Sequence, residues 1–89
     1  NPFNRSASIR YLSPIDANIK LDIFNAKGVH IYRLFEGEKH AGIYTLSWDG
    51  KNNYGQDVSS GMYIILLEAY NLQYNRHHYT ETRKVILVK

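Results

Sequence analysis

The segment Trp48–Tyr63 constrains the fold of this chain more than any other feature of its sequence. Residues that favour tight turns recur along it, because glycine adopts a positive φ angle without steric cost and asparagine tolerates the left-handed region. These turn formers are Gly50, Asn52, Asn53, Gly55, Ser60 and Gly61. The segment therefore predicts a structured crossing between two β-strands. We also expect Gly61, which opens the longest apolar run, to tolerate valine less well than Gly37.

Hydrophobic and polar residues alternate along most of the chain, which indicates strands rather than helices. In Ala17–Asn25, alternate positions from Ile19 to Ile23 are aliphatic, whereas the positions between them include Lys20 and Asp22. This pattern predicts one buried face and one solvent-facing face. The expected strands are Ser8–Leu12, Ala17–Asn25, Val29–Phe35, Ile43–Trp48, Met62–Tyr70 and His77–Val88.

The arrangement of these strands predicts an all-β fold. The polar segment Glu36–Gly42 is expected to be a loop, and counting Gln56–Ser59 as a strand gives about seven short strands. Short strands separated by glycine- and asparagine-rich turns are typical of an Ig-like antiparallel β-sandwich. Trp48 shares one face of its strand with Tyr44 and Leu46, so we expect it at the centre of the core.

Length and composition indicate one folded domain over residues 1–89. A chain of 89 residues is long enough for one hydrophobic core, and a hydrophobic content of 44% argues against disorder. Cysteine is absent, which excludes disulfides and thiolate metal sites. No apolar run approaches the roughly 18 residues of a membrane-spanning helix.

The formal net charge of +3 and the isoelectric point near 9.2 raise the possibility of an anionic partner. Most basic residues are scattered, which is typical of solvated sheet faces, but several gather between Arg76 and Lys89. A patch for lipopolysaccharide or an acidic receptor is the alternative. No motif of a nucleic-acid-binding fold accompanies the basic residues, so nucleic acid is not an expected partner.

The sequence predicts no catalytic centre and no cofactor. The histidines are His30, His40, His77 and His78. Neighbours on a strand point to opposite faces, so the last two cannot hold one metal ion together. The chain also lacks a Gly-x-Ser-x-Gly turn, a phosphate-binding loop and a zinc-protease helix motif. We therefore expect a non-catalytic domain.

A calcium site is a weaker alternative in the turn-rich segment. Its oxygen-bearing residues Asp49, Asn52, Asn53 and Asp57 are candidate ligands. In an EF-hand loop that began at Asp49, however, Lys51 would occupy the third position and Tyr54 the sixth, where a ligand and a glycine are required. We expect these side chains to bind turn amides instead.

Aromatic residues divide into expected core residues and expected surface residues. Trp48 and Tyr63 fall on faces that should point inward, and they are expected to pack in the core. Tyr54, Tyr74 and Tyr79 are better candidates for exposed rings, which in an accessory module would bind carbohydrate.

The same motifs resemble a family of Ig-like domains of secreted bacterial proteins: the flagellar hook-cap (FlgD-type) Ig-like domains and the type IX secretion C-terminal sorting domains. Their shared pattern includes NPFNP, a strand ending in N-x-x-G, W-D-G, S-G-x-Y and a terminal K-x-x-L-x-K. Arg5 stands where the second proline is usual. Matching residues are Asn1, Pro2, Phe3, Asn4, Ile9, Tyr11, Leu12, Asn25, Gly28, Ala41, Gly42, Trp48, Asp49, Gly50, Gly55, Ser60, Gly61, Tyr63, Lys84, Leu87 and Lys89.

The resemblance implies a non-catalytic C-terminal module of a larger exported protein, reaching the cell surface or the medium through the periplasm. An outer-membrane translocon would read the domain, with Lys84, Val85, Leu87 and Lys89 as the candidate recognition residues, and the cargo would then be anchored to lipopolysaccharide. Other partners would be an assembly protein and the upstream domains of the same polypeptide. The alternatives are an accessory carbohydrate-binding module and a structural Ig-like spacer or hook-cap assembly domain.

Overall fold

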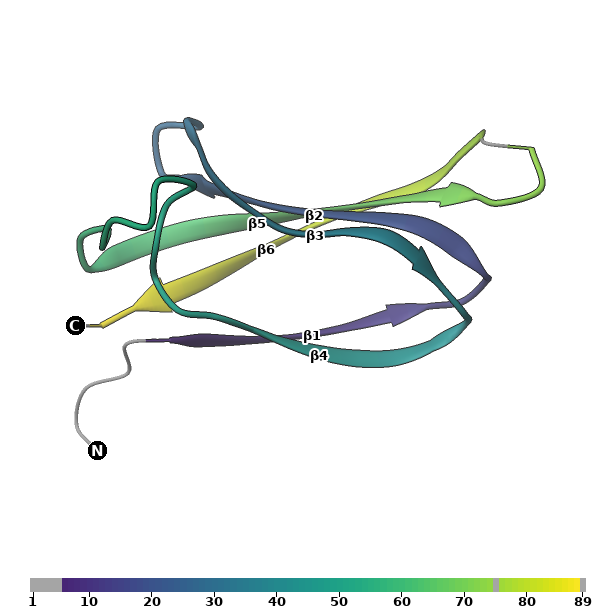
Figure 1. The fold of residues 1–89 in the computed structure, drawn as a ribbon, viewed down its shortest axis with the longest axis horizontal. Helices are drawn as coiled ribbons and strands as arrows, with labels where there is room; N and C mark the ends of the chain where they lie inside the picture. The colour runs from purple at the N-terminus through teal and green to yellow at the C-terminus, as the bar shows by residue number, and fades with distance from the viewer. Residues whose placement is uncertain (1–5, 75, 89) are drawn as a thin grey trace.

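The computed structural model describes residues 6–74 and 76–88, which form two antiparallel sheets packed face to face (Figure 1). A small sheet pairs β1 with β4, and a large sheet has the order β3-β2-β5-β6. The strands are β1 (Ala7–Ser13), β2 (Ala17–Asn25), β3 (His30–Lys39), β4 (Gly42–Trp48), β5 (Gly61–Asn71) and β6 (Arg76–Leu87). The predicted all-β Ig-like sandwich is confirmed. The described residues contain no helix long and apolar enough to cross a membrane.

The core lies between the small sheet and the two central strands of the large sheet. On β2, Ile19, Leu21 and Ile23 are all fully buried, as their alternation predicts. β5 lies between β2 and β6 and buries every second residue in the same way. The remaining buried hydrophobic residues include Ile9, Tyr11, Trp48, Tyr63, Ile65, Leu67 and Leu87. The predicted central position of Trp48 is confirmed, because none of its surface is exposed.

The β2–β3 hairpin shows how a local sequence signal produces a turn. The Asn25 side-chain oxygen accepts hydrogen bonds from the amides of Lys27, at 2.9 Å, and Val29, at 3.0 Å. The Gly28 amide donates to the Asn25 carbonyl at 2.9 Å. One asparagine therefore bonds three amides of the turn, which fixes the register of the two strands.

The prediction of a loop over Glu36–Gly42 is wrong, because β3 continues to Lys39 and only two residues connect it to β4. Glu36 and Glu38 pair across the ladder with Lys20 and Asn18 of β2. Polar residues on the outer face of an edge strand resemble a loop in sequence, although their backbone is fully paired on one side. The segment Gln56–Ser59 contributes an isolated bridge between Asp57 and Lys51.

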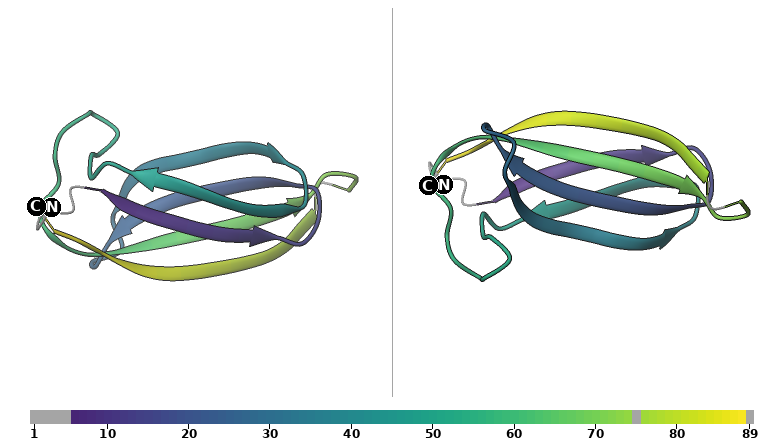
Figure 2. Two further views of the ribbon diagram at one scale, coloured as in Figure 1. Left: turned by 90° about the horizontal axis from the view of Figure 1, so that it is seen from below. Right: turned by 90° about the horizontal axis from the view of Figure 1, so that it is seen from above.

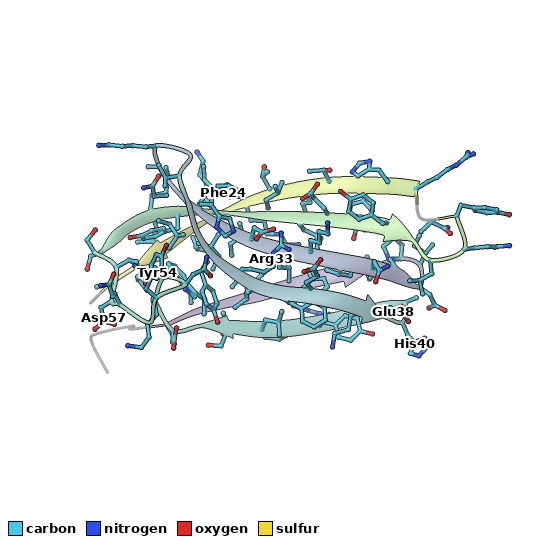
Figure 3. The ribbon with its side chains drawn as sticks, turned by 45° about the horizontal axis from the view of Figure 1, so that its top comes forward. Phe24, Arg33, Glu38, His40, Tyr54 and Asp57 are labelled. Carbon is cyan, nitrogen blue, oxygen red and sulfur yellow. The ribbon has the colours of Figure 1, made fainter. Side chains whose placement is uncertain are left out.

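Asp22 departs from the expected solvent-facing side of β2, since only 3% of its surface is exposed. His30 Nε2 lies 2.7 Å from its Oδ1, and Arg33 donates from Nε at 3.0 Å and from Nη2 at 3.2 Å. Arg33 also donates to Glu36 at 2.9 Å. His30 and Arg33 of β3 thus cover a carboxylate on the neighbouring strand. Arg33 is labelled in Figure 3.

The sandwich is elongated, and the described chain enters β1 and leaves β6 at the same end (Figure 1). The β5–β6 turn projects from the opposite end. β3 and β6 form the two margins of the large sheet, while β1 lies on the side of β6 and β4 on the side of β3 (Figure 2).

Candidate interaction surface

The segment Trp48–Tyr63 closes one end of the sandwich around two aromatic rings. The rings of Trp48 and Tyr63 meet edge to face, with centroids 5.0 Å apart. Trp48 Nε1 donates to the Lys51 carbonyl at 2.9 Å, and the Tyr63 hydroxyl donates to the Ser59 carbonyl at 2.6 Å. Each ring thus fills the core with its body and holds the loop with its polar atom. These contacts connect the motif to the core.

Asn52 uses its side-chain oxygen within this loop. Asn52 accepts from the amides of Tyr54 at 2.9 Å and Gln56 at 3.0 Å. Gly50 and Gly55 adopt φ angles of 75° and 77°, which glycine reaches without strain. The loop is therefore built from turn chemistry.

Asn53 also joins the loop to the free edge of β3. Its amide donates to the Ile31 carbonyl at 3.1 Å, and its side-chain oxygen accepts from the Arg33 amide at 3.2 Å. One residue thus supplies β3 with the donor and acceptor that a neighbouring strand would otherwise provide. This contact covers part of one margin of the large sheet.

The four calcium candidates do not converge in the arrangement that the ion requires. The Asn52 and Asn53 oxygens accept backbone amides, and the Asp57 carboxylate lies 3.2 Å from Lys51 Nζ. Asp49 is exposed. Among the described residues, no three histidine, aspartate or glutamate side chains form a group that could hold a metal ion.

Described histidine side chains lie apart from one another. His30 contacts Asp22, His40 lies 3.7 Å from the Asp16 carboxylate, and His77 lies 2.6 Å from the Thr80 hydroxyl. Of these pairs, His77–Thr80 joins an imidazole to a hydroxyl, and both side chains are exposed on β6 rather than enclosed in a pocket.

The candidate recognition residues on β6 separate into three environments. Lys84 is exposed, Val85 is half-buried against the core, and Leu87 is fully buried. The Leu87 side chain therefore belongs to the core and is not available to a partner of the folded domain. Lys89 lies outside the described residues. Lys84 is the member of the set whose side chain a partner can reach.

β1 and β6 belong to different sheets and lie on the same side of the sandwich, and we call the junction between them the seam. Two side chains of β6 cross the seam and bind β1. The Tyr79 hydroxyl donates to the Leu12 carbonyl at 2.6 Å, and Arg83 Nη1 donates to the Arg10 carbonyl. Arg83 Nε also donates to Glu81 at 2.9 Å. The expectation that Tyr79 is an exposed ring is wrong, since the ring is half-buried against the core. Burial raises the pKa of the Tyr79 hydroxyl.

Tyr54 and Tyr74 are exposed as predicted, with 87% and 66% of their surfaces accessible. Tyr54 lies in the loop before β5 (Figure 3), and Tyr74 lies in the turn after β5. These two segments occupy opposite ends of the elongated sandwich (Figure 1). The two rings therefore cannot form one carbohydrate platform.

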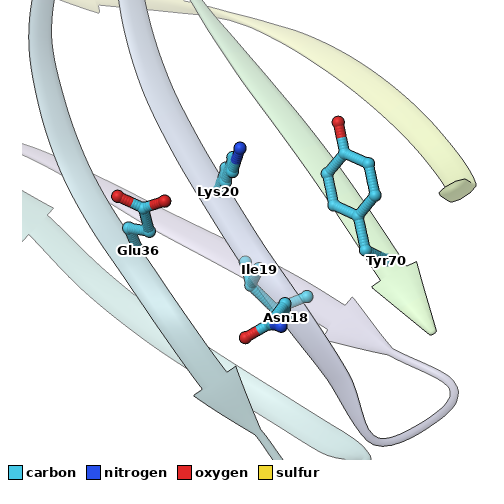
Figure 4. Close-up of a pocket in the computed structure, with 5 residues that line it drawn as sticks. All are labelled: Asn18, Ile19, Lys20, Glu36 and Tyr70. Atoms are coloured by element: carbon cyan, nitrogen blue, oxygen red, sulfur yellow. The ribbon is translucent and has the colours of Figure 1, made fainter. Parts of the chain in front are cut away.

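A polar hollow of about 300 Å³ lies on the outer face of the large sheet (Figure 4). Glu36, Lys20 and Tyr70 surround it from β3, β2 and β5, respectively, with Asn18 at its base. Lys20 Nζ lies 5.3 Å from the centroid of the Tyr70 ring, and the Tyr70 hydroxyl donates to Glu68 at 3.0 Å. That hydrogen bond raises the pKa of the Tyr70 hydroxyl. The charged and hydroxyl groups of the lining already have partners, since Glu36 accepts from Arg33, Tyr70 donates to Glu68 and Lys20 lies over the Tyr70 ring.

Sequence reasoning missed the Asp22 network and the β1–β6 seam. Both depend on which strands become neighbours, because Arg33 reaches Asp22 across one ladder, and Tyr79 reaches Leu12 across two sheets. The clustering of basic residues after Arg76 was the available signal for the seam, but it did not identify the strand opposite.

Comparison with known proteins places these features in a family. The model of the FlgD Ig-like domain matches residues 4–73. A crystal structure of FlgD from P. aeruginosa superposes with a TM-score of 0.76 at 19% sequence identity, over 91% of this chain. The chain spans 60% of the length of that structure. A search of curated protein sequences gave no significant match. Because the family model covers most of the chain, and the sandwich is shared with FlgD, the chain belongs to the FlgD Ig-like domain family.

Proposed function

We propose that this domain is a non-catalytic structural module through which a larger protein assembles with a protein partner. One observation carries the proposal: β6 is an edge strand of 12 residues that pairs with no further strand among the described residues. An edge of this length presents backbone donors and acceptors that suit contact with another polypeptide. Membership of the FlgD Ig-like family supports a structural role over a catalytic one.

The location of the chain ends supports the same proposal. β1 begins and β6 ends at one end of the sandwich (Figure 1). A domain attached through that end would hold the edge of β6 and the β5–β6 turn away from the attachment. The carbohydrate-binding alternative is less favoured, because the exposed tyrosines lie at opposite ends.

Site-specific photo-cross-linking tests the proposal. A photoreactive residue at Thr82, which is exposed on β6, should cross-link a defined protein in cells that produce the whole protein. The matched control is Ser47, which is exposed on β4 of the small sheet. Cross-links of equal yield from both positions, or carbohydrate adducts in place of protein, would contradict an assembly role for β6.

A more specific candidate is sorting by a type IX outer-membrane translocon, with lipopolysaccharide anchoring after export. The exposure of Lys84 on the last strand favours this candidate, because the first lysine of the terminal motif is accessible to a receptor. The family match ends at residue 73 and does not extend to this strand. Identification of a translocon component in the Thr82 cross-link would support sorting over a purely structural role.

A further inference from the structure

The seam between β1 and β6 contains two adjacent hollows of about 220 and 340 Å³. The first is lined by Arg10, Tyr11, Leu12, Ile43 and Arg83, and the second by Leu12, Pro14, Tyr79, Glu81 and Arg83. They share Leu12 and Arg83 as lining residues, so they lie next to each other along the seam. We refer to the two hollows together as the seam groove.

Apolar groups and cations alternate along the seam groove. Leu12 is 55% exposed and Ile43 is 58% exposed, and the two residues pair across the β1–β4 ladder, so they form one exposed apolar patch. Arg10 forms no ion pair among the described residues, and Arg83 is paired with Glu81 at the exposed margin. Two of the five guanidinium donors of Arg83 bind Glu81 and the Arg10 carbonyl. The groove therefore has an excess of positive charge beside exposed apolar surface.

The edge of β6 runs beside this groove. β6 forms one margin of the large sheet, and β1 lies on the same side of the sandwich (Figure 2), so a strand added to β6 would lie on that side. Successive side chains of a strand point to opposite faces, so every second side chain of an added strand would point toward the seam groove. The other side chains would lie next to Thr82 and Lys84 on the outer face of the sheet.

We propose that β6 and the seam groove together bind an extended acidic segment of a partner protein by strand addition. The backbone of the segment pairs with the β6 edge, its apolar side chains enter the hollow next to Leu12, and its carboxylates contact Arg10 and Arg83. This mode gives affinity through main-chain hydrogen bonds and specificity through alternate side-chain pockets. The inference rests on the proposed assembly function and specifies the chemistry of the partner.

The positive charge of β6 favours an acidic segment of a partner protein over a second copy of the chain at this edge. Arg76, Arg83 and Lys84 outnumber the single acid of β6, Glu81, which is already paired with Arg83. Two copies of β6 would bring these excess positive charges together, whereas an acidic segment neutralises them. Charged residues on an edge strand also disfavour self-association.

Peptide titration followed by NMR tests the inference. The probe is a short synthetic peptide in which threonine alternates with glutamate or valine, added to the isotope-labelled chain. We expect amide shifts confined to β1 and β6, and weakening of binding by about fivefold or more in the Arg10→Glu variant. Lys27→Glu is the matched control, because Lys27 is an exposed lysine in the β2–β3 turn, away from the seam.

Two modified peptides separate strand addition from simple charge attraction. A peptide methylated on alternate backbone nitrogens keeps its charge but cannot complete the ladder, and it should not bind. A peptide with lysine in place of glutamate should not bind either. Equal binding of the methylated peptide, shifts on another face, or a β6-mediated dimer of the free chain in sedimentation would overturn the inference. If Thr82 cross-links to a protein in cells but the acidic peptide does not bind, the inference is wrong and the assembly function is still supported.

Discussion

At the residue scale, single side chains combine packing with a specific polar contact. Trp48 is fully buried, packs against Tyr63 and donates to the Lys51 carbonyl. Truncation of a large buried aromatic side chain removes apolar contacts and leaves a cavity. In a small domain, this loss is a large share of the total stability of about 5–15 kcal/mol.

Trp48→Ala is therefore expected to lower the free energy of unfolding by about 3–5 kcal/mol. Trp48→Phe should cost less, since it keeps part of the ring contact with Tyr63 and loses mainly the bond to Lys51. Urea unfolding of the three proteins, followed by circular dichroism, measures both differences. A tryptophan-to-alanine variant as stable as the parent would show that the ring contributes little to the core.

Asp22 predicts a specific loss of stability in acid. Burial raises the pKa of its carboxyl, but hydrogen bonds from Arg33 and His30 outweigh burial and hold the pKa below the ordinary value of 3.8. A carboxyl whose pKa is lower in the folded than in the unfolded state stabilises the fold when the pH is above its pKa in the unfolded state. This stabilisation is lost as the pH falls through its pKa in the folded state. We expect Asp22→Asn to be less stable at neutral pH and to show a shallower decline of stability below about pH 4. Parallel acid declines in urea unfolding of the two proteins would rule out this role.

Valine substitutions at Gly37 and Gly61 test how well the local sequence predicts which glycine tolerates a side chain. Their φ angles of 156° and 151° both disfavour a side chain. A Cβ at Gly37 would lie 3.3 Å from the Phe35 ring, whereas a Cβ at Gly61 would meet nothing within 4 Å. We therefore expect Gly37→Val to be the more destabilising substitution, by about 1–3 kcal/mol, which reverses the sequence prediction. Melting temperatures of the two variants decide the order, and a lower value for Gly61→Val would support the sequence pattern instead.

At the element scale, the sequence predicts strands well where alternation reflects burial on one face. β2 matches its predicted bounds, because its inward residues are aliphatic and its ends are marked by turn residues. β3 is longer than predicted, because its outer residues Glu36 and Glu38 face solvent on an edge strand. Alternation also gave no indication that Arg33 would bury Asp22. Pairings between distant strands determine such contacts, and a period-two pattern contains no information about them.

The loop between β4 and β5 provides a test of the turn interpretation. Asn52 bonds two loop amides and Asn53 bonds β3, so their oxygens already have partners. We expect that neither calcium nor EDTA changes the melting temperature of the domain, because a ligand stabilises only a state that binds it. Scanning calorimetry with each additive is the measurement. A rise of several degrees with calcium, reversed by EDTA, would restore the calcium interpretation.

At the scale of the whole molecule, the sandwich protects some edges and leaves another accessible. Asn53 covers part of the β3 margin, and side chains of β6 bond two carbonyls of β1. The outer edge of β6 remains beside the seam groove, at the margin of the large sheet. Family membership and the fold were predictable from motifs spread along the chain, whereas this edge required the strand order. An exposed final strand is common to the structural and the sorting roles, so a functional experiment must separate them.

Export of a reporter separates these roles. With a signal peptide supplied and the chain fused behind the reporter, the sorting role predicts passage across the outer membrane of a bacterium that has a type IX apparatus. Deletion of the terminal residues is a poor variant, because it removes the buried Leu87 and therefore part of the core. Lys84→Glu reverses an exposed charge without touching the core, and it should retain the reporter in the periplasm, whereas the control Lys27→Glu should not. If the parent fusion stays in the periplasm, or if Lys84→Glu is exported as well as the parent, the sorting role is excluded and the structural assembly role is the one consistent with the fold.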